Sequence, residues 1–327
     1  MSKIPVIIIS GFLGSGKTTL LKQLIERCDD KKIQPAVLMN EIGKTDLDGE
    51  ILNQTNNNQI VEKLLDGCIC CNKKDEVTDS MIKLLKKQPD VIFIELTGVA
   101  NPEEVVDSLT EPELKNYIYL EKVVTVLDGE NVLEYNSIFE SDRELVRTTR
   151  RQIEVADVLI VNKVDLITDS YKEKVKKAVL KQNPVSPIYF TTYSEIDIEY
   201  LLINIKQIKA KPVHKILNKN EHSHAENIHK HGHTHGHSQS FSRIKTVTLY
   251  VNKTTKSSKI EKFLKKWRPN LLRAKGYIPL KDGCYLFQHA MKRNYWEPSQ
   301  YTGAKYLVLI GINLSTEEIQ GEWDKSI

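Results

Sequence analysis

The segment Gly11-Phe-Leu-Gly-Ser-Gly-Lys17-Thr18 constrains the fold of this chain more than any other part of its sequence. It lies between an apolar run at residues 6–9 and a helical pattern at residues 18–27. Glycines at such a strand-to-helix turn let backbone N–H groups point at phosphate oxygens, and the N-terminus of the helix adds a favourable dipole. The segment therefore predicts a Walker A phosphate-binding loop.

In a loop of this type, Lys17 bridges the β- and γ-phosphates and the hydroxyl of Thr18 binds Mg²⁺. Lys17 is also an expected catalytic residue. The residues of the loop expected to bind the nucleotide are Gly11, Gly14, Ser15, Gly16, Lys17, Thr18 and Thr19.

Residues 1–210 alternate short apolar runs with helical patterns, which is typical of βαβ units. The predicted fold is an α/β P-loop NTPase domain, with a doubly wound, mostly parallel sheet and helices on both faces. Strands are expected at residues 6–9, 36–39, 91–94, 123–127 and 158–161. Helices are expected at residues 18–27, 78–87, 102–109, 143–155 and 171–181.

The pattern changes after residue 210. Residues 211–243 are polar and hold eight of the nine histidines, which predicts a flexible His-rich linker. Residues 244–327 predict a small C-terminal α+β domain. Its expected strands lie at residues 244–251, 271–278, 285–288 and 306–312, with one helix near 257–266 and another after residue 315.

The composition predicts a cytoplasmic, globular protein. The chain has 327 residues, of which 40% are hydrophobic, and no run of 18 apolar residues. Its first 17 residues lack the apolar region and cleavage site of a signal peptide. No membrane contact is therefore expected.

The C-terminal domain is basic, with 15 Lys or Arg against 7 Asp or Glu in residues 244–327. An acidic partner, the acidic N-terminal domain, nucleic acid or a solvated lysine face would each account for this charge. Because no aromatic-basic recognition motif accompanies the charge, nucleic-acid binding is not expected.

An acidic residue ends the apolar run at residues 91–94. Glu95-Leu-Thr97-Gly98 follows it, and NTPases place a carboxylate near Mg²⁺ and a glycine N–H near the γ-phosphate at such a strand end. We therefore expect Glu95 to bind Mg²⁺ together with Thr18, and Glu95 and Gly98 to act in catalysis.

The strand predicted at residues 158–161 continues into Asn162-Lys163-Val-Asp165. A carboxylate can accept two hydrogen bonds from the guanine N1–H and exocyclic amine, whereas adenine offers no matching pair. Asp165 is thus expected to select GTP, and Asn162 and Lys163 to pack the base and hold the loop. Residues 191–194 are a further candidate for contact with the base.

Three of the five cysteines lie together in Gly67-Cys68-Ile-Cys70-Cys71. Thiolates are soft ligands for Zn²⁺, Cu⁺ or similar ions, and three of them need a fourth ligand from elsewhere. An incomplete set suits metal transfer better than a permanent structural site. Buried thiols or a redox pair are the alternatives.

The histidines of the linker predict a second, less selective metal feature. Imidazoles on a flexible chain bind zinc, nickel, copper or cobalt. An affinity-tag artefact or a merely solvated linker would also account for them. The expected auxiliary ligands are His229, His231, His233, His235 and His237.

Taken together, these elements resemble the CobW-like family, a branch of the P-loop GTPases. Its relatives activate nickel and cobalamin enzymes, and its members are implicated in zinc or cobalt allocation. The resemblance spans nearly the whole chain, and Cys-x-Cys-Cys is its most specific mark. The matching segments are residues 11–18, 40–43, 67–71, 95–102, 124–128, 162–165 and 272–276.

The resemblance implies a metal site in the switch region formed by Cys68, Cys70 and Cys71, with GTP state coupled to metal affinity. Family members often carry a further acidic residue where this chain has Lys44, so the remaining ligand is open, and Glu41 is our candidate. The implied protein is a slow GTPase using GTP, Mg²⁺ and Zn²⁺, with Co²⁺ or Ni²⁺ as alternatives to zinc. An unidentified client metalloprotein is the expected partner, and a homodimer is left open.

Three other functions are compatible with the sequence. The chain could be a GTPase activator that inserts cobalt, nickel or iron into an enzyme. It could be a zinc store with a vestigial P-loop, which intact Lys17, Thr18 and Glu95 argue against. It could be an ATP-dependent small-molecule kinase, which Asp165 argues against.

Overall fold

The computed structural model describes residues 3–40, 60–64, 74–137, 141–207, 242–290 and 293–326. Its first sheet has seven strands in the order β3-β2-β4-β1-β5-β6-β7, and every neighbouring pair is parallel. The strands are β1 (Ile4–Ser10), β2 (Pro35–Asn40), β3 (Ile60–Leu64), β4 (Val91–Glu95), β5 (Ile118–Asp128), β6 (Val158–Asn162) and β7 (Ile188–Phe190).

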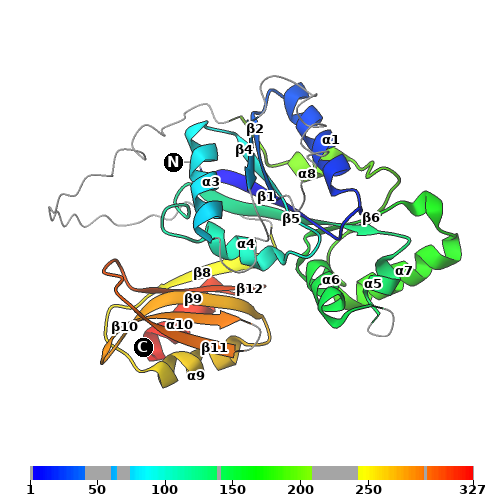
Figure 1. Cartoon of the computed structure of the whole chain (residues 1–327). Helices are drawn as coiled ribbons and strands as arrows, with labels where there is room; N and C mark the ends of the chain where they lie inside the picture. The colour runs from blue at the N-terminus through cyan, green and yellow to red at the C-terminus, as the bar shows by residue number, and fades with distance from the viewer. Residues whose placement is uncertain are drawn as a thin grey trace.

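Helices cover both faces of this sheet (Figure 1). On β1, Val6 and Ile8 pack on the face with α3 and α4, whereas Ile7 and Ile9 pack on the face with α1 and α8. The helices are α1 (Lys17–Asp30), α3 (Lys74–Lys86), α4 (Pro102–Leu109), α5 (Val132–Tyr135), α6 (Arg143–Val155), α7 (Asp169–Gln182) and α8 (Ile198–Leu202).

The predicted doubly wound α/β fold is confirmed, and the sheet is wholly rather than mostly parallel. Each strand expected in this region is present. Central strands such as β1 and β4 are buried along their whole length, because helices cover both faces. This is why these strands appear in the sequence as unbroken apolar runs and not as alternating patterns.

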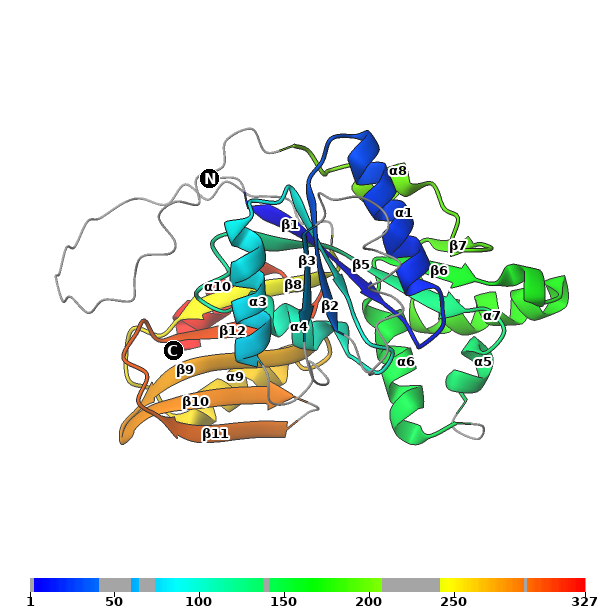
Figure 2. The same ribbon diagram turned by 45° about the horizontal axis from the view of Figure 1, so that its top comes forward.

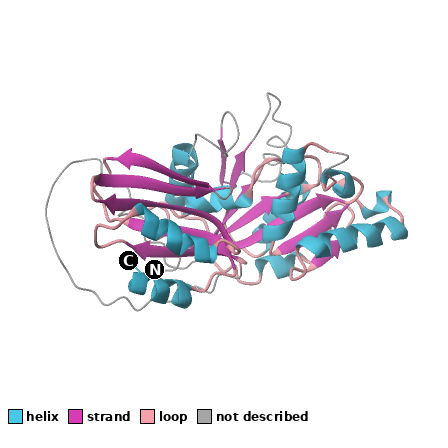
Figure 3. Ribbon diagram, turned by 90° about the horizontal axis from the view of Figure 1, so that it is seen from below, coloured by secondary structure: helices cyan, strands magenta, loops and turns pink. Residues whose placement is uncertain are grey.

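The second sheet is antiparallel, with the strand order β11-β10-β9-β12-β8. Its strands are β8 (Ile244–Tyr250), β9 (Leu271–Leu280), β10 (Gly283–Ala290), β11 (Arg293–Ser299) and β12 (Tyr306–Ile312). Helices α9 (Ser257–Trp267) and α10 (Thr316–Ser326) pack on one face through a shared apolar core (Figure 3). The expected small α+β domain is therefore present.

Strand β11 was not expected from the sequence. It is an edge strand, and it contains Pro298 and mostly polar residues. Edge strands tolerate proline and polar side chains because one side of the strand makes no ladder hydrogen bonds. The proposed linker boundaries, 211 and 243, stay predictions, because residues 208–241 lie outside the described residues.

Helix α4 lies between the two sheets (Figures 1 and 2). Seven of its eight residues are buried. Val105 and Val106 share one apolar core with Leu272 of β9 and with Val308 of β12. The C-terminal sheet therefore packs on the helix that follows the Glu95–Gly98 segment.

Two ion pairs add to this packing. Arg273 Nε lies 2.8 Å from Asp107 Oδ2 in α4, and the Asp107 side chain is fully buried. Lys275 on the same strand pairs with Glu111 just beyond α4. A carboxylate as deeply buried as that of Asp107 needs a cationic partner, so its contact with Arg273 helps to specify how the domains dock.

Loss of the buried pair should destabilise the protein strongly. Arg273→Met keeps most of the side-chain length but leaves Asp107 without its guanidinium, which should lower the free energy of unfolding by about 3 kcal/mol. Lys266→Met is the control, because the Lys266–Glu322 pair is exposed to solvent and should contribute little to stability. Urea denaturation would measure both, and equal losses would contradict the prediction.

Asp157 joins the two domains at the start of the C-terminal part. Its carboxylate accepts the backbone N–H of Val123 at 2.7 Å and the backbone N–H of Arg243. Burial raises the pKa of Asp157 to about 6, although hydrogen bonds from Arg243 and Val123 act in the opposite direction.

This shift predicts a pH-dependent term in stability. The ordinary pKa is 3.8, so between about pH 4 and pH 6 the folded protein holds a proton that the unfolded chain releases. The stabilising contribution of the Asp157 carboxyl to the free energy of unfolding is therefore complete below about pH 4 and is lost as the pH rises through about 6. We expect the wild-type protein to lose stability relative to Asp157→Asn across this window, measured by urea denaturation at several pH values. A constant difference would refute this.

Within the described ranges, no helix has both the length and the apolar composition that a bilayer span requires.

Candidate nucleotide site

The Walker A segment forms the turn between β1 and α1, as predicted. Gly11, Gly14 and Gly16 have φ values of 131°, 71° and 107°, which glycine adopts without strain. A Cβ atom on Gly11 would lie 2.0 Å from the carbonyl oxygen of Val126. The loop is therefore pressed against β5, and the fold at this position requires glycine.

Two side chains of the loop are buried beside its backbone. Lys17 is 7% exposed, and its Nζ donates to the carbonyl oxygen of Phe12 at 3.0 Å. The hydroxyl of Ser15 is buried and has no hydrogen-bond partner among the described residues. A lysine folded over the loop, with spare polar atoms beside it, fits a loop that binds phosphate.

Glu95 lies next to this loop because β4 pairs with β1. The hydroxyl of Thr18 donates to Glu95 Oε1 at 2.8 Å, across 77 residues of sequence. Gly98 is also in contact with the loop, since a Cβ atom there would lie 2.5 Å from the backbone nitrogen of Leu13. The two residues expected to bind Mg²⁺ are thus in direct contact, and the donor set of one hydroxyl and one carboxylate suits that ion.

Asn162 connects three loops. Its Nδ2 donates to the carbonyl oxygen of Ser15 at 2.9 Å, and its Oδ1 accepts the backbone N–H of Ser194 at 2.7 Å. The hydroxyl of Ser194 in turn donates to the carbonyl oxygen of Gly16 at 3.1 Å. The end of β6, the Walker A loop and the segment after β7 are therefore held together by one buried amide.

Lys163 and Asp165 are the other two functional candidates in the segment that follows β6. Lys163 has φ 62°, and its Nζ lies 2.7 Å from Asp128 Oδ2 at the end of β5. Asp128 is buried and also accepts the backbone N–H of Glu130 at 3.0 Å. Asp165 is exposed in the short 3-10 helix Val164–Leu166. Its carboxylate is therefore accessible to a ligand.

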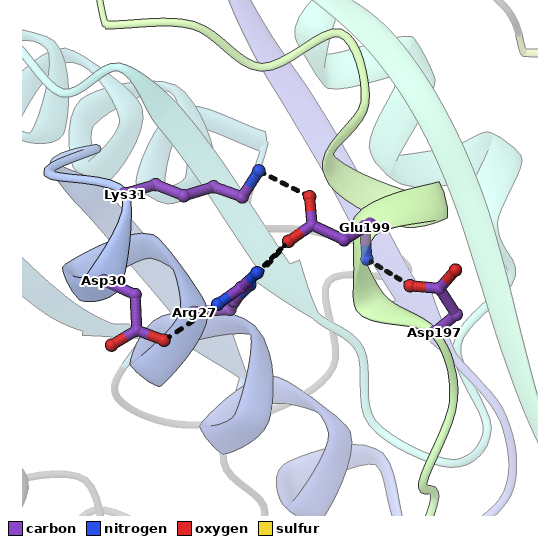
Figure 4. A network of polar contacts seen from close by, with 5 residues as sticks. All are labelled: Arg27, Asp30, Lys31, Asp197 and Glu199. Atoms are coloured by element: carbon purple, nitrogen blue, oxygen red, sulfur yellow. Dashed lines mark hydrogen bonds and ion pairs between the residues drawn. The ribbon is translucent and has the colours of Figure 1, made fainter.

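The segment after β7 is also attached to the helix that follows the Walker A loop (Figure 4). Arg27 of α1 and Lys31, the residue after this helix, both pair with Glu199 of α8, and their hydrogen bonds lower the pKa of Glu199, with Lys31 contributing most. Asp197 accepts the backbone N–H of Glu199 and caps this helix. These contacts fix α8 relative to α1, although all four charged side chains are at least partly exposed.

Two contacts of the site were not expected from the sequence: that of Asp128 with Lys163, and that of Ser194, considered there only as part of a candidate base contact, with Gly16. Asp128 ends a buried strand and precedes a glycine, as Glu95 ends its own strand, and this parallel could have indicated it. Ser194 follows Tyr193, and both have positive φ values, 58° and 53°. Nothing in the local sequence signals a contact between Ser194 and a loop 178 residues away.

The expected metal ligands cannot be placed. Glu41, the three cysteines Cys68, Cys70 and Cys71, and the linker histidines lie outside the described residues. Among the residues that are described, no three His, Cys, Asp or Glu side chains are grouped to hold a metal ion. Of the other two cysteines, Cys28 is buried, and burial raises the pKa of its thiol to about 12. This thiol is unsuited to metal binding.

The parallel sheet, the glycine-rich loop and the Thr18–Glu95 contact define a P-loop nucleotide-binding protein. Residues 5–190 match the family model described as CobW/HypB/UreG, nucleotide-binding domain, and residues 244–327 match the cobalamin synthesis protein cobW C-terminal domain. The first match covers more than half of the sequence. The chain belongs to the CobW/HypB/UreG family.

Curated relatives carry zinc in their names. The chain is 34% identical over 204 residues to zinc-regulated GTPase metalloprotein activator 1 of Schizosaccharomyces pombe, covering 60% of this chain and 48% of the relative. It is 31% identical over 208 residues to the zinc chaperone CobW of a Sinorhizobium species, covering 57% and 58%. The chain thus spans about half the length of these relatives. The Zn(II)-bound YjiA GTPase of E. coli aligns over the whole of both chains at 20% identity, with a TM-score of only 0.47.

The loop glycines should differ in their tolerance of substitution. Gly11→Ala combines an unfavourable φ with a collision against the Val126 carbonyl, and should destabilise the protein by about 3 kcal/mol or more. Gly14 has open space around it, so Gly14→Ala should cost only about 1 kcal/mol from its left-handed backbone. Denaturant unfolding of the two variants would measure this, and similar losses would show that the contact with β5 is unimportant.

Proposed function

We propose that this protein is a GTP-hydrolysing metallochaperone. In this proposal it binds zinc, or a similar transition metal, at Cys68, Cys70 and Cys71, and it couples its GTP state to metal delivery to a client protein. The observation that carries the nucleotide part is the contact of Thr18 with Glu95 beside a glycine-rich loop, in a chain of the CobW/HypB/UreG family.

GTP hydrolysis would depend mainly on positioning and charge. Backbone N–H groups of the loop and Lys17 would hold the phosphates, and the N–H of Gly98, a residue that lies against the loop, would meet the γ-phosphate. Mg²⁺, when bound by Thr18 and Glu95, supplies positive charge that offsets the phosphate charge. The sequence contains no evident arginine finger, since Arg147, Arg150 and Arg151 belong to helix α6, so slow intrinsic turnover is expected.

Guanine selection is assigned to Asp165. Its exposed carboxylate would accept hydrogen bonds from N1–H and the exocyclic amine, which adenine cannot supply. Asn162 and Lys163 are proposed to pack the base and to hold the loop, as expected from the sequence. Their bonds to Ser15 and Asp128 hold the loops on which the base and phosphates would rest.

The strand pairing supports a link between nucleotide and metal. Met39 of β2 lies opposite Glu95 of β4, and Asn40 lies opposite Leu64 of β3. Both strands therefore end at the edge of the sheet that carries Glu95, and the sequence reaches Cys68 four residues after Leu64. A change at the γ-phosphate side of the site would then act near the thiol segment. Glu41, one residue past β2, is our candidate for a further ligand.

The second candidate is a GTPase activator that inserts cobalt, nickel or iron into an enzyme. The relative named as a metalloprotein activator favours this version, and it uses the same nucleotide chemistry. The zinc store is disfavoured because buried Lys17 and the contact of Thr18 with Glu95 support a nucleotide site that still functions. His229, His231, His233, His235 and His237 would buffer metal in each version, and Co²⁺ or Ni²⁺ would compete with zinc.

The partner in this proposal is a client metalloprotein, and its identity is open, as is a homodimer. The cytoplasmic location stays a prediction. Neither a membrane nor a nucleic acid is part of the proposed mechanism.

Zinc should change the behaviour of the nucleotide site. GTP affinity and GTP hydrolysis would be measured with and without one equivalent of Zn²⁺, and with ATP as the competing nucleotide. We expect a change of about tenfold in affinity or turnover, equivalent to about 1.4 kcal/mol of coupling, and a clear preference for GTP. The effect should vanish when Cys68, Cys70 and Cys71 are all changed to serine.

Cys284→Ser is the matched control, because Cys284 is half-buried in the C-terminal sheet and distant in sequence from the motif. It should retain the zinc effect. A zinc response that survives in the triple variant would reject the thiol site, and the absence of GTP hydrolysis in every protein would reject the GTPase assignment.

A further inference from the structure

A fully buried glutamine contacts the segment that follows Glu95. Gln152 lies in α6, and its Nε2 donates to the carbonyl oxygens of Gly98 at 3.1 Å and Ala100 at 3.0 Å. Both bonds are buried and join residues more than 50 positions apart. The amide therefore holds the segment at two points, one on each side of the exposed Val99.

The position of Gln152 is itself fixed from two directions. The hydroxyl of Thr125 in β5 donates to the backbone carbonyl of Gln152 at 3.0 Å. On the neighbouring residue, Arg151 Nε lies 3.1 Å from Glu103 Oε1 in α4. Because β5 pairs with β1, the glutamine is tied to the strand that leads into the Walker A loop.

The segment held by Gln152 has little room to move toward that loop. A Cβ atom on Gly98 would lie 2.5 Å from the backbone nitrogen of Leu13. The backbone N–H of Ala100 donates to the carbonyl of Thr97 at 3.0 Å, which closes a turn. The carbonyls of Gly98 and Ala100 are thus fixed on the side of α6. Because each peptide unit is planar, the hydrogen bond that holds the Thr97 carbonyl also sets the direction of the Gly98 N–H in the same unit.

Stability alone is a poor explanation for this glutamine. Its Oε1 is buried and has no hydrogen-bond partner among the described residues. An unpaired buried acceptor offsets much of what two neutral hydrogen bonds contribute. Since this side chain makes two hydrogen bonds but leaves one buried acceptor unpaired, its presence is better explained by the geometry that it imposes on residues 98–100.

We propose that Gln152 is a positioning residue for the γ-phosphate end of the nucleotide site. The inference rests on the proposed GTPase function. By holding the carbonyls of Gly98 and Ala100, Gln152 fixes the turn that the Ala100 N–H closes on the Thr97 carbonyl, and so keeps the Gly98 N–H in place for the terminal phosphate of GTP. GDP lacks that phosphate, so its binding depends on the Walker A loop and the base contacts and not on Gln152.

A matched pair of variants separates positioning from structural support. Asn183 is also fully buried, and its Nδ2 donates to two backbone carbonyls, those of Ile153 at 2.8 Å and Ala156 at 3.0 Å. Its Oδ1 accepts the backbone N–H groups of Val185 and Ser186, and none of these four partners belongs to the nucleotide site. Gln152→Met and Asn183→Leu therefore each delete one buried amide that donates to two backbone carbonyls, with a similar volume retained.

Three quantities would be measured on the full-length protein: the turnover of GTP, the melting temperature, and the ratio of dissociation constants for GDP and a slowly hydrolysed GTP analogue. Both variants should melt earlier. Only Gln152→Met should lower kcat, by about tenfold to a hundredfold, because small misplacements of positioning groups have effects of this size. This variant should also weaken the binding of the GTP analogue relative to that of GDP by about tenfold.

The proposal is overturned if Gln152→Met keeps the wild-type kcat and affinity ratio, or if Asn183→Leu shows the same losses. If the wild-type protein binds GTP but does not hydrolyse it, the proposed GTPase function fails, while the affinity ratio still decides the role of Gln152.

Gln152→Glu provides a second variant with the shape of the side chain retained. When ionised, glutamate has no donor for the two carbonyls, whereas the protonated acid has one. Relative to the wild type at each pH, the affinity for the GTP analogue should therefore recover as the pH is lowered. A ratio to wild type that does not change with pH in this variant counts against positioning by hydrogen bonds.

Discussion

The parallel hydrogen bonding of seven strands brings the ends of β1, β4, β5 and β6 to one edge of the sheet. Each of these strands delivers a polar group there: the Walker A loop, Glu95, Asp128 and Asn162. In an antiparallel sheet, half of these groups would lie at the opposite edge. Ligands of open α/β sheets bind at the carboxyl ends of the strands for this reason.

Asn162 shows how the edge is kept rigid. One buried amide group bonds to the Walker A loop and to the segment after β7, and Ser194 completes the link by bonding to Gly16. A Cβ atom on Gly16 would lie 2.4 Å from Asn162 Nδ2, so close approach of backbone and amide depends on that glycine. The conformation of the phosphate-binding loop is therefore determined by residues far away in the sequence as well as by its own glycines.

A segment that begins at this edge also contacts the second domain. The segment from Glu95 to Ala100 leads directly into α4, whose far end carries Asp107, the partner of Arg273. Gln152 holds the start of this stretch, and the C-terminal sheet holds its end. A movement of residues 95–100 would therefore disturb contacts in both domains. The Leu272–Gly276 motif, noticed in the sequence only as a resemblance, thereby acquires a physical role in domain docking.

The sequence by itself determined the local features: the buried strands, the amphipathic helices, the glycine-rich turn and the chemical types of its candidate ligands. These follow from patterns within a few residues, where apolar runs and glycines restrict the backbone directly. It did not give the edge strand β11, whose polar residues lack an apolar pattern. Only the tertiary structure decided that Ser194 meets Gly16, that Lys163 meets Asp128 and that Gln152 meets Gly98. Such contacts depend on strand order and helix packing, which place residues tens to hundreds of positions apart within hydrogen-bonding distance.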